Sequence, residues 1–399
     1  MQNLIHQIDE LAESFYDEVV GFRRHFHQNP ELSFEEFETS KYIQEKLTEL
    51  QIPFTAGYVK TGIVGHIEGK KKGTGPTIAL RADMDALPIK EDSDAPYCST
   101  NSGVMHACGH DAHSAALLGA AKMLKQLEDE FAGTIVLIFQ PGEEEHPGGA
   151  KLMLESGALD AFKPDIILGQ HVLPEMEVGH VGFRPGMYMA SGDEIHFTVK
   201  GKGGHGALPH KLTDTVLTTA HILTSMQQIV SRNAPATIPT VLSFGKVIAD
   251  GATNIIPNEV VVAGTFRTMN EAWRAEAKRR MAEVAHGTAA AMGASVDLEI
   301  KHGYPVLHND DKATVRAMGY AKELLGEACV ESMDLRMTCE DFAYYSLEYP
   351  VCFMRFGVKG EGEDIKGGLH TPKFDIDEKA LKTAMSNLAY LAIRFQQEG

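Results

Sequence analysis

The stretch from Met105 to His113, MHACGHDAH, concentrates one thiol, three imidazoles and a carboxylate in nine residues. Cys108 and His110 are two residues apart, so in an extended segment their side chains point to the same side. A thiolate and a neutral imidazole suit a first-row transition metal better than Ca²⁺ or Mg²⁺. Two ligands do not complete such a site, so the other donors must come from elsewhere in the chain.

Further donors follow the ends of predicted strands. The β-branched or aromatic runs 77–87, 134–140, 165–172 and 351–357 predict buried strands of a mostly parallel sheet. The carboxyl ends of parallel strands meet at one edge of a sheet. The donors at these ends are Asp83, Asp85, Glu143, Glu144, Glu145, His171 and His370. Cys108 and His110 precede a predicted helix, 114–127, for which Asp111 is the expected N-cap. Each donor alone has an ordinary structural explanation, but their convergence predicts a metal site.

The number of donors predicts two ions, because it exceeds the four that one tetrahedral ion uses. Two ions roughly 3.5–4 Å apart can activate a shared water and polarise a carbonyl group. A hydrolase of this kind also needs a carboxylate that binds no metal and carries a proton from the water to the leaving amine. Three consecutive glutamates, 143–145, could divide these tasks, and the residues alone do not say which does which.

The middle of the chain has a different pattern. Strand, helix, strand, strand, helix and strand are predicted at 194–201, 213–231, 240–248, 259–267, 271–292 and 295–300. This β-α-β-β-α-β order is typical of a ferredoxin-like unit. An amphipathic helix that ends before Pro30 opens the chain. The sequence therefore predicts an α/β catalytic domain, residues 1–187 and 300–399, interrupted by a ferredoxin-like satellite domain, residues 188–299.

Composition limits the class of protein. The 399 residues favour two domains, and 43% hydrophobic with 23% charged residues is ordinary for a globular protein. The net charge of −18 argues against a nucleic-acid partner, and no apolar run is long enough to predict a membrane span. Five scattered cysteines and the lack of a signal-type N-terminus predict a cytoplasmic protein with reduced thiols.

Motifs along nearly the whole chain resemble the M20 family of metallopeptidases, and more narrowly its amidohydrolase branch. In order they are RADMDALP (81–88), MHACGHDAH (105–113), QPGEE…GGA (140–150), GQHV (169–172), GKGGHGALPH (201–210), TNIIPNE (253–259), GTFRT (264–268), EDF (340–342) and GLHTP (368–372). That branch holds aminoacylases, hippurate hydrolases, N-acetyl-diaminopimelate deacetylases and plant auxin-conjugate hydrolases. Its fold, an α/β catalytic domain with a ferredoxin-like satellite that often dimerises, agrees with the one predicted above.

Residue by residue, the resemblance implies that the metal ligands are Cys108, His110, Glu144, His171 and His370. It makes Glu143 the general base and Asp83 a carboxylate that orients a ligand. One departure is the sequence Glu145-His146-Pro147, where family members usually have glycines, and it could alter the charge of the pocket.

The resemblance also assigns three substrate-binding residues to the satellite domain: His205, Asn254 and Arg267. In related dimeric enzymes the equivalent of His205 reaches the partner subunit's site and stabilises the developing oxyanion. Arg267 is the expected fork for a substrate carboxylate. Cys339 stands where a serine or glycine is commoner, with no evident consequence.

Together these features predict a metal-dependent hydrolase that cleaves N-acyl amino acids into an amino acid and a carboxylic acid. Two divalent ions per subunit are expected, Zn²⁺ first and Mn²⁺, Co²⁺ or Ni²⁺ as alternatives, in a homodimer or higher homo-oligomer with no nucleic-acid or membrane partner. A dipeptidase or carboxypeptidase-like activity is the alternative within the family. Two rivals outside it are a thiol hydrolase with Cys108 as nucleophile, paired with His110 or His113, and an inactive binding module that keeps the fold.

Overall fold

The computed structural model describes residues 2–397 and divides into two compact units. Within these residues, the first unit comprises the chain up to Gly186, His308–Asp334 and the chain from Asp341 onward. The second comprises Met187–Leu307 and Leu335–Glu340. No helix in residues 2–397 combines the length and the apolar character that crossing a membrane requires.

The boundary between the units differs from the predicted one, because residues 300–307 and 335–340 belong to the second unit. Strand β13 (Ser295–Lys301) continues to Lys301, which pairs with Glu194 of the same sheet. Gly192 donates a backbone hydrogen bond to Tyr304 (2.9 Å), and Ala190 donates to the carbonyl of Arg336 (3.0 Å). Such backbone bonds between distant segments leave no pattern in the sequence.

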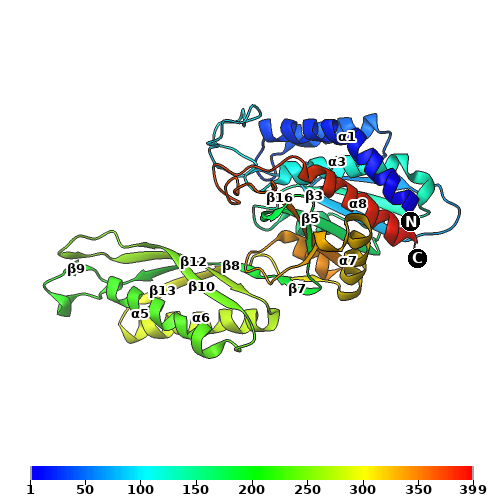
Figure 1. Cartoon of the computed structure of the whole chain (residues 1–399). Helices are drawn as coiled ribbons and strands as arrows, with labels where there is room; N and C mark the ends of the chain where they lie inside the picture. The colour runs from blue at the N-terminus through cyan, green and yellow to red at the C-terminus, as the bar shows by residue number, and fades with distance from the viewer. Residues whose placement is uncertain (1, 398–399) are drawn as a thin grey trace. The chain divides into compact units, whose positions relative to one another are not determined.

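The first unit is built on an eight-stranded sheet with the order β1-β2-β4-β3-β5-β16-β6-β15. Strands β3, β5 and β16 of this sheet are labelled in Figure 1. Its central neighbours β4–β3, β3–β5 and β5–β16 are parallel, and so are β6 and β15. The other three pairs are antiparallel. The strands are β1 (Phe54–Tyr58), β2 (Gly62–Glu68), β3 (Thr77–Asp83), β4 (Thr134–Gln140), β5 (Ile166–Glu177), β6 (Val181–Phe183), β15 (Val330–Ser332) and β16 (Val351–Lys359). The predicted mostly parallel α/β fold is confirmed.

Helices cover this sheet and share one hydrophobic core with it. Helix α1 (Gln2–Gln28) ends before Pro30 as predicted and buries Leu4, Ile8, Phe15, Val19 and Phe22 along one stripe. It packs on α3 (His110–Gln126) and α8 (Ala380–Gln397), and α7 (Asp311–Leu325) packs on α8 (Figure 1). The remaining helices are α2 (Phe37–Glu49) and α4 (Gly149–Glu155).

The start of α3 differs from the prediction. The helix begins at His110, and its N-cap is Gly109, with φ +86°. Cys108 and His110 therefore do not lie in one extended segment, because the left-handed glycine turns the chain between them. A side chain on Gly109 would also meet Val172 Cγ2 at 2.7 Å. Asp111 lies inside the first turn, where its carboxylate accepts from Arg23 Nε at 2.8 Å, so the N-cap prediction was wrong.

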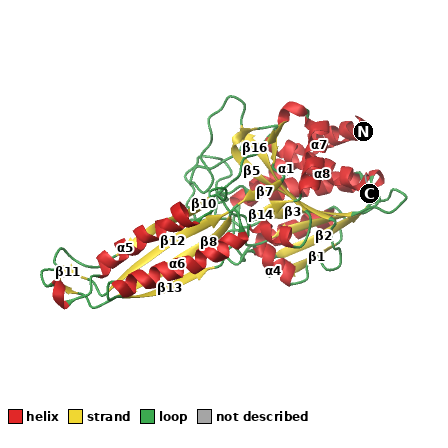
Figure 2. Ribbon diagram, turned by 90° about the horizontal axis from the view of Figure 1, so that it is seen from below, coloured by secondary structure: helices red, strands yellow, loops and turns green. Residues whose placement is uncertain are grey.

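The second unit has the predicted β-α-β-β-α-β order. Its elements are β8 (Ser191–Lys200), α5 (Thr215–Gln228), β10 (Thr240–Ile248), β12 (Glu259–Thr268), α6 (Glu271–Ala291) and β13. The antiparallel sheet has the order β10-β12-β8-β13, and the two helices lie along it (Figure 2). Two-residue strands β9 (Gly204–His205) and β11 (Ile255–Ile256) pair with each other. Two further short strands are β7 (Gly186–Met189) and β14 (Leu307–Asn309).

Candidate metal centre

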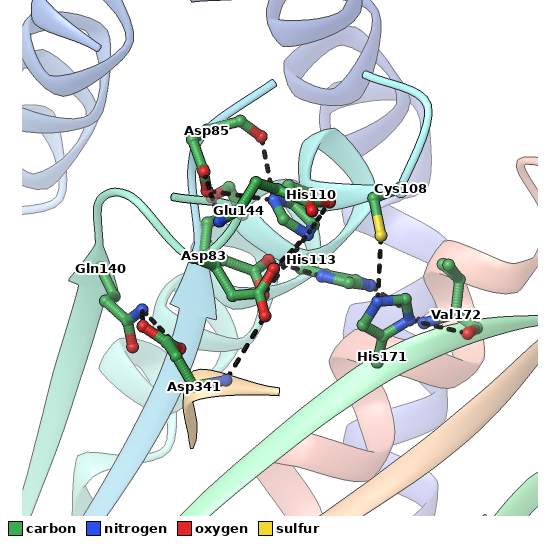
Figure 3. Close-up of polar contacts among 12 residues, drawn as sticks. Asp83, Asp85, Cys108, His110, His113, Gln140, Glu144, His171, Val172 and Asp341 are labelled. Carbon is green, nitrogen blue, oxygen red and sulfur yellow. Dashed lines mark hydrogen bonds and ion pairs between the residues drawn. The ribbon is translucent and has the colours of Figure 1, made fainter. Parts of the chain in front are cut away.

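Five segments of the first unit bring the predicted donors together near the carboxyl ends of the central strands. Figure 3 shows Asp83, Cys108, His110, Glu144 and His171 among them. Asp83 ends β3, and Glu143 and Glu144 follow β4. Cys108 precedes α3, and His370 lies in the loop after β16. His171 differs from expectation, because β5 continues beyond it to Glu177. The loop of His370 is held where the residue's backbone N–H donates to the carbonyl of Ala107 (2.8 Å).

Cys108 lies at the centre of these donors. Its Sγ is 3.4 Å from His171 Nε2 and 3.3 Å from His370 Nε2, and His370 Nε2 is 3.1 Å from Glu144 Oε1. Two donors bound to one tetrahedral ion by bonds of about 2.0–2.3 Å lie about 3.3–3.8 Å apart. The distances from Cys108 to His171 and His370 fall in this range, and that from His370 to Glu144 is slightly shorter.

His110 contributes a buried ring nitrogen to the same place. Its Nε2 has no hydrogen-bond partner within residues 2–397. Carboxylate oxygens of Asp83, Glu143 and Glu144 stand 3.8, 3.9 and 4.0 Å from it, beyond hydrogen-bonding distance. A buried polar atom in this position is costly unless something binds it, and a cation among these oxygens would do so.

Hydrogen bonds on the far side of two imidazoles prepare them as ligands. His171 Nδ1 donates to the carbonyl of Val172 at 2.8 Å, and His110 Nδ1 donates to the carbonyl of Asp85 at 2.9 Å. In the neutral ring each bond leaves Nε2 with a lone pair directed at the cluster. For His110, burial opposes the charged ring, but the negative charges of Asp83 and Asp85 outweigh it and raise the pKa to about 10, so a bound cation would take the place of the proton on this ring. Burial lowers the pKa of His171 well below its usual value, and the charge of Arg355 adds to this effect. His171 is therefore a neutral ligand-type imidazole.

The surroundings of Cys108 favour a metal ligand over a free nucleophile. Burial raises the pKa of its thiol well above the usual value, and the negative charges of Glu144 and Glu143 raise it further. A nucleophilic cysteine needs a lowered pKa, which this environment does not provide. A nearby divalent cation would supply the positive charge that a thiolate needs here. The donor set thus fits a bound metal and weakens the thiol-hydrolase alternative.

Two aspartates have roles that differ from the expected ones. The carboxylate that fixes the ring of His110 is that of Asp85, with Oδ1 3.2 Å from Nδ1. Asp83 Oδ1 instead lies 2.6 Å from Nδ1 of His113, whose Nε2 accepts from the backbone N–H of Val172 at 2.9 Å. The sequence placed both aspartates at a strand end, but the choice between them depends on side-chain directions that spacing does not give.

A buried ion network lies below this layer. Arg81 Nη1 donates to Asp83 Oδ2 at 2.6 Å, Nη2 donates to Asp341 Oδ1 at 2.9 Å, and Nε donates to Gln140 Oε1 at 2.9 Å. Gln140 Nε2 also donates to Asp341 Oδ2 at 2.8 Å. From the sequence, Arg81 could be a buried ion-pair partner or an edge residue, and the structure shows the buried ion pair. Asp341 was visible in the sequence only as part of the motif EDF. The three segments they come from, β3, β4 and the chain after Glu340, are tied together beneath Asp83.

Replacing Arg81 with methionine should lower the free energy of unfolding by about 3–5 kcal/mol, because two buried carboxylates lose their cation. Urea titration followed by circular dichroism measures this loss. The matched control is Arg24→Met, since the Arg24 side chain is 46% exposed where it meets Glu378. That variant should lose about 1 kcal/mol or less. Equal losses in the two variants would contradict the importance of the buried network.

The satellite residues lie at two ends of the second unit. His205 belongs to β9. The backbone carbonyl of Asn254 accepts from the N–H of Gly206, the residue that follows His205, at 2.8 Å. Arg267 pairs with Gly192 at the other end of β12, where its guanidinium contacts Thr265 and Cys339. Arg267 lies eight residue steps along β12 from Glu259, which is a distance of roughly 27 Å at about 3.4 Å per residue. Within this unit the structure does not bring the three predicted substrate contacts together.

The two residues that depart from the family pattern are exposed. Glu145 and His146 lie at the tip of the loop after Glu144, whereas Glu143 is buried. Cys339, the other departure, contacts the guanidinium of Arg267, a consequence that the sequence did not suggest.

Comparisons with known proteins identify the family of this chain. Residues 79–394 match Peptidase family M20/M25/M40, so the chain belongs to this family. It is an enzyme of the family's amidohydrolase branch. An N-acetyl-L-cysteine deacetylase of Bacillus subtilis is 40% identical over 91% of this chain and 85% of its own length. An N-acyl-L-amino acid amidohydrolase of Geobacillus stearothermophilus is 39% identical over 76% of this chain and 82% of its own length.

A solved structure is similar over almost the whole chain. It is that of YxeP from Bacillus subtilis, described as a dinuclear metal binding peptidase from the M20 family. The TM-score is 0.81 with 34% identity, and the alignment covers 96% of this chain and 99% of the other. The fold of this chain is thus shared with a member of the family that is described as metal-binding.

Proposed function

We propose that this enzyme hydrolyses the amide bond of N-acyl amino acids with two divalent metal ions. The observation that carries the proposal is the position of Cys108 between two groups of donors. One group joins it with His110 and His171, and the other with Glu144 and His370, and the ligand atoms of each group lie within 4.8 Å of one another. Cys108, His110, Glu144, His171 and His370 are the residues that would hold the ions. Zn²⁺ is the first choice, and Mn²⁺, Co²⁺ and Ni²⁺ suit the same donors.

When bound, the ions would supply Lewis-acid activation of a water and polarisation of the acyl carbonyl. The chain supplies the proton transfer. Glu143 is buried, its Oε2 is 3.9 Å from His110 Nε2, and its Oε1 is 3.4 Å from the backbone N–H of Asp341. In the proposed reaction Glu143 takes a proton from the attacking water and passes it to the leaving nitrogen, so that the acyl group leaves as a carboxylic acid and the nitrogen as an amine.

The satellite residues complete the proposal. His205 Nδ1 accepts from the backbone N–H of Ala207 at 3.1 Å, which leaves Nε2 as a donor for a developing oxyanion. Arg267 would bind the substrate carboxylate and so favour amino acid conjugates over plain amides. Because a long strand separates these two residues, one small substrate meets both only if they come from two copies of the chain. A homodimer through the satellite domain is therefore part of the proposal.

Mixing two inactive variants tests this arrangement. His205→Ala and Glu143→Gln chains, co-expressed with different tags, should regain about a quarter of the wild-type activity. The reason is that half of the dimers are mixed and one of their two sites is intact. The measurement is the activity of the co-purified mixture against each parent variant. If the mixture is no more active than its parents, His205 acts within its own chain.

The activity itself is tested with a panel of substrates. Protein stripped of metal is loaded with each ion in turn, and free amine is measured with N-acetyl, N-benzoyl and dipeptide substrates. Release of amine from N-acyl amino acids supports the proposal. Release from dipeptides alone would favour the peptidase alternative, and no release from any substrate with any ion would overturn both.

A further inference from the structure

Two buried carboxylates from outside the loop hold the backbone on both sides of Glu143. Glu36 Oε1 accepts from the N–H of Gly142 at 2.9 Å, and Asp85 Oδ2 accepts from the N–H of Glu144 at 2.9 Å. Glu36 and Asp85 are 0% and 1% exposed. We propose that Glu36 is a positioning residue that fixes the main chain of the general base. This inference rests on the proposed role of Glu143.

The segment that carries Glu36 is itself built against the loop of Glu143. Phe34 adopts φ +63°, which is uncommon for a residue with a side chain, and its N–H donates to the same Glu36 Oε1 at 2.9 Å. Its ring lies against Gly142, where a Cβ would be 2.3 Å from Phe34 Cε1. Ser33 Oγ donates to Asp85 Oδ2 at 2.7 Å. One oxygen of Glu36 thus joins two segments that are 106 residues apart.

Bonds inside the loop do not replace this tether. Gly149 donates to the carbonyl of Gly142, and Gly148 donates to that of Glu145, both at 2.9 Å. These bonds close the loop on itself, whereas Glu36 and Asp85 connect it to the segment of Phe34 and to the end of β3. A base that moves by about 1 Å from its reacting atom can lose about a hundredfold in rate. The tether therefore has a direct consequence for the proton transfer.

The chemistry around Glu36 provides a conservative replacement. Its second oxygen, Oε2, accepts from Thr61 Oγ1 at 2.7 Å, and a hydroxyl can donate or accept. Burial raises the pKa of Glu36 to about 7, and the negative charge of Asp85 adds to the rise. The neutral form keeps Oε1 as the acceptor for both N–H groups and donates to Thr61 instead. Glutamine has the same acceptor and donor pattern, so Glu36→Gln should preserve the tether.

The test compares Glu36→Ala, Glu36→Gln and Thr61→Val in metal-loaded enzyme. Two quantities are measured: kcat and KM on an N-acyl amino acid, and amide hydrogen exchange in peptides that cover residues 139–148. Glu36→Ala should lower kcat about 10- to 100-fold with little change in KM, and it should speed up exchange in these peptides. Glu36→Gln should keep most of the activity, and its amide exchange in these peptides should stay as slow as in the wild type. Thr61→Val removes one bond to the same carboxylate without touching Gly142, so it should lower thermal stability while leaving kcat unchanged.

Wild-type kcat and wild-type exchange in Glu36→Ala would overturn the inference. It would also fail if Thr61→Val lost as much activity as Glu36→Ala, because the effect would then be one of stability. If Glu36→Ala does not fold, Glu36→Asp takes its place, since the shorter side chain cannot reach both N–H groups. Retained activity in Glu143→Gln would refute the proposed base, whereas the exchange measurement would still decide whether Glu36 holds the loop.

Discussion

Replacing Glu143 with glutamine should lower kcat at least about a thousandfold, because the amide cannot take a proton from water or return it to the leaving nitrogen. KM should change little, since the substrate contacts remain. The metal content of the purified protein should also stay the same, because Glu143 is not among the five predicted ligands. Steady-state kinetics and elemental analysis of the same preparation measure the three quantities together.

The matched control is Glu145→Gln, which removes the same charge from an exposed neighbour. Its kcat should stay close to that of the wild type. Distance alone does not separate the two glutamates, because His110 Nε2 lies 3.9 Å from Glu143 and 4.0 Å from Glu144. The experiment therefore decides between them. If Glu143→Gln loses metal while Glu144→Gln keeps it, the two glutamates have exchanged their proposed tasks.

Local sequence patterns were sufficient for most of the architecture. Strand β10 (Thr240–Ile248) coincides with its predicted range, and α6 ends one residue before the end of its own predicted range. Helix α6 has a clear start, because the side chain of the N-cap Asn270 accepts from the N–H of Trp273. The location of the site could be predicted for a similar reason. Parallel strands point their carboxyl ends to one edge, so residue order alone placed Asp83, Glu143 and Glu144 there.

The rest depended on contacts that the sequence does not encode locally. Nothing in the segment ADMD distinguishes Asp83, which contacts His113, from Asp85, which contacts His110. The helix start at His110 was missed because a left-handed Gly109, rather than a polar side chain, occupies the N-cap position. The tether from Glu36 joins segments far apart in the chain, and only the folded structure places its carboxylate against Gly142.

Removing the metal should abolish activity, with a loss of at least about a thousandfold, and readding the ion should restore it. The physical reason lies in the donors: Cys108 is buried, its thiol has a raised pKa, and His110 Nε2 lacks a hydrogen-bond partner within residues 2–397. These groups do no chemistry without a cation. The measurement is amine release before chelation, after chelation and after titration with Zn²⁺, Mn²⁺, Co²⁺ or Ni²⁺.

A pair of cysteine variants separates metal binding from thiol chemistry. Cys108→Ala should lose both bound metal and activity, because the two donor groups share this sulfur. Cys352→Ala is the matched control, since Cys352 is also buried (0% exposed, against 7% for Cys108) but lies in β16, and burial raises its thiol pKa to about 12. That variant should keep metal and activity and lose only stability, from the small cavity left behind. Full activity after chelation, combined with inactivation by a thiol-alkylating reagent, would instead identify Cys108 as a nucleophile, and the metal centre would then be refuted.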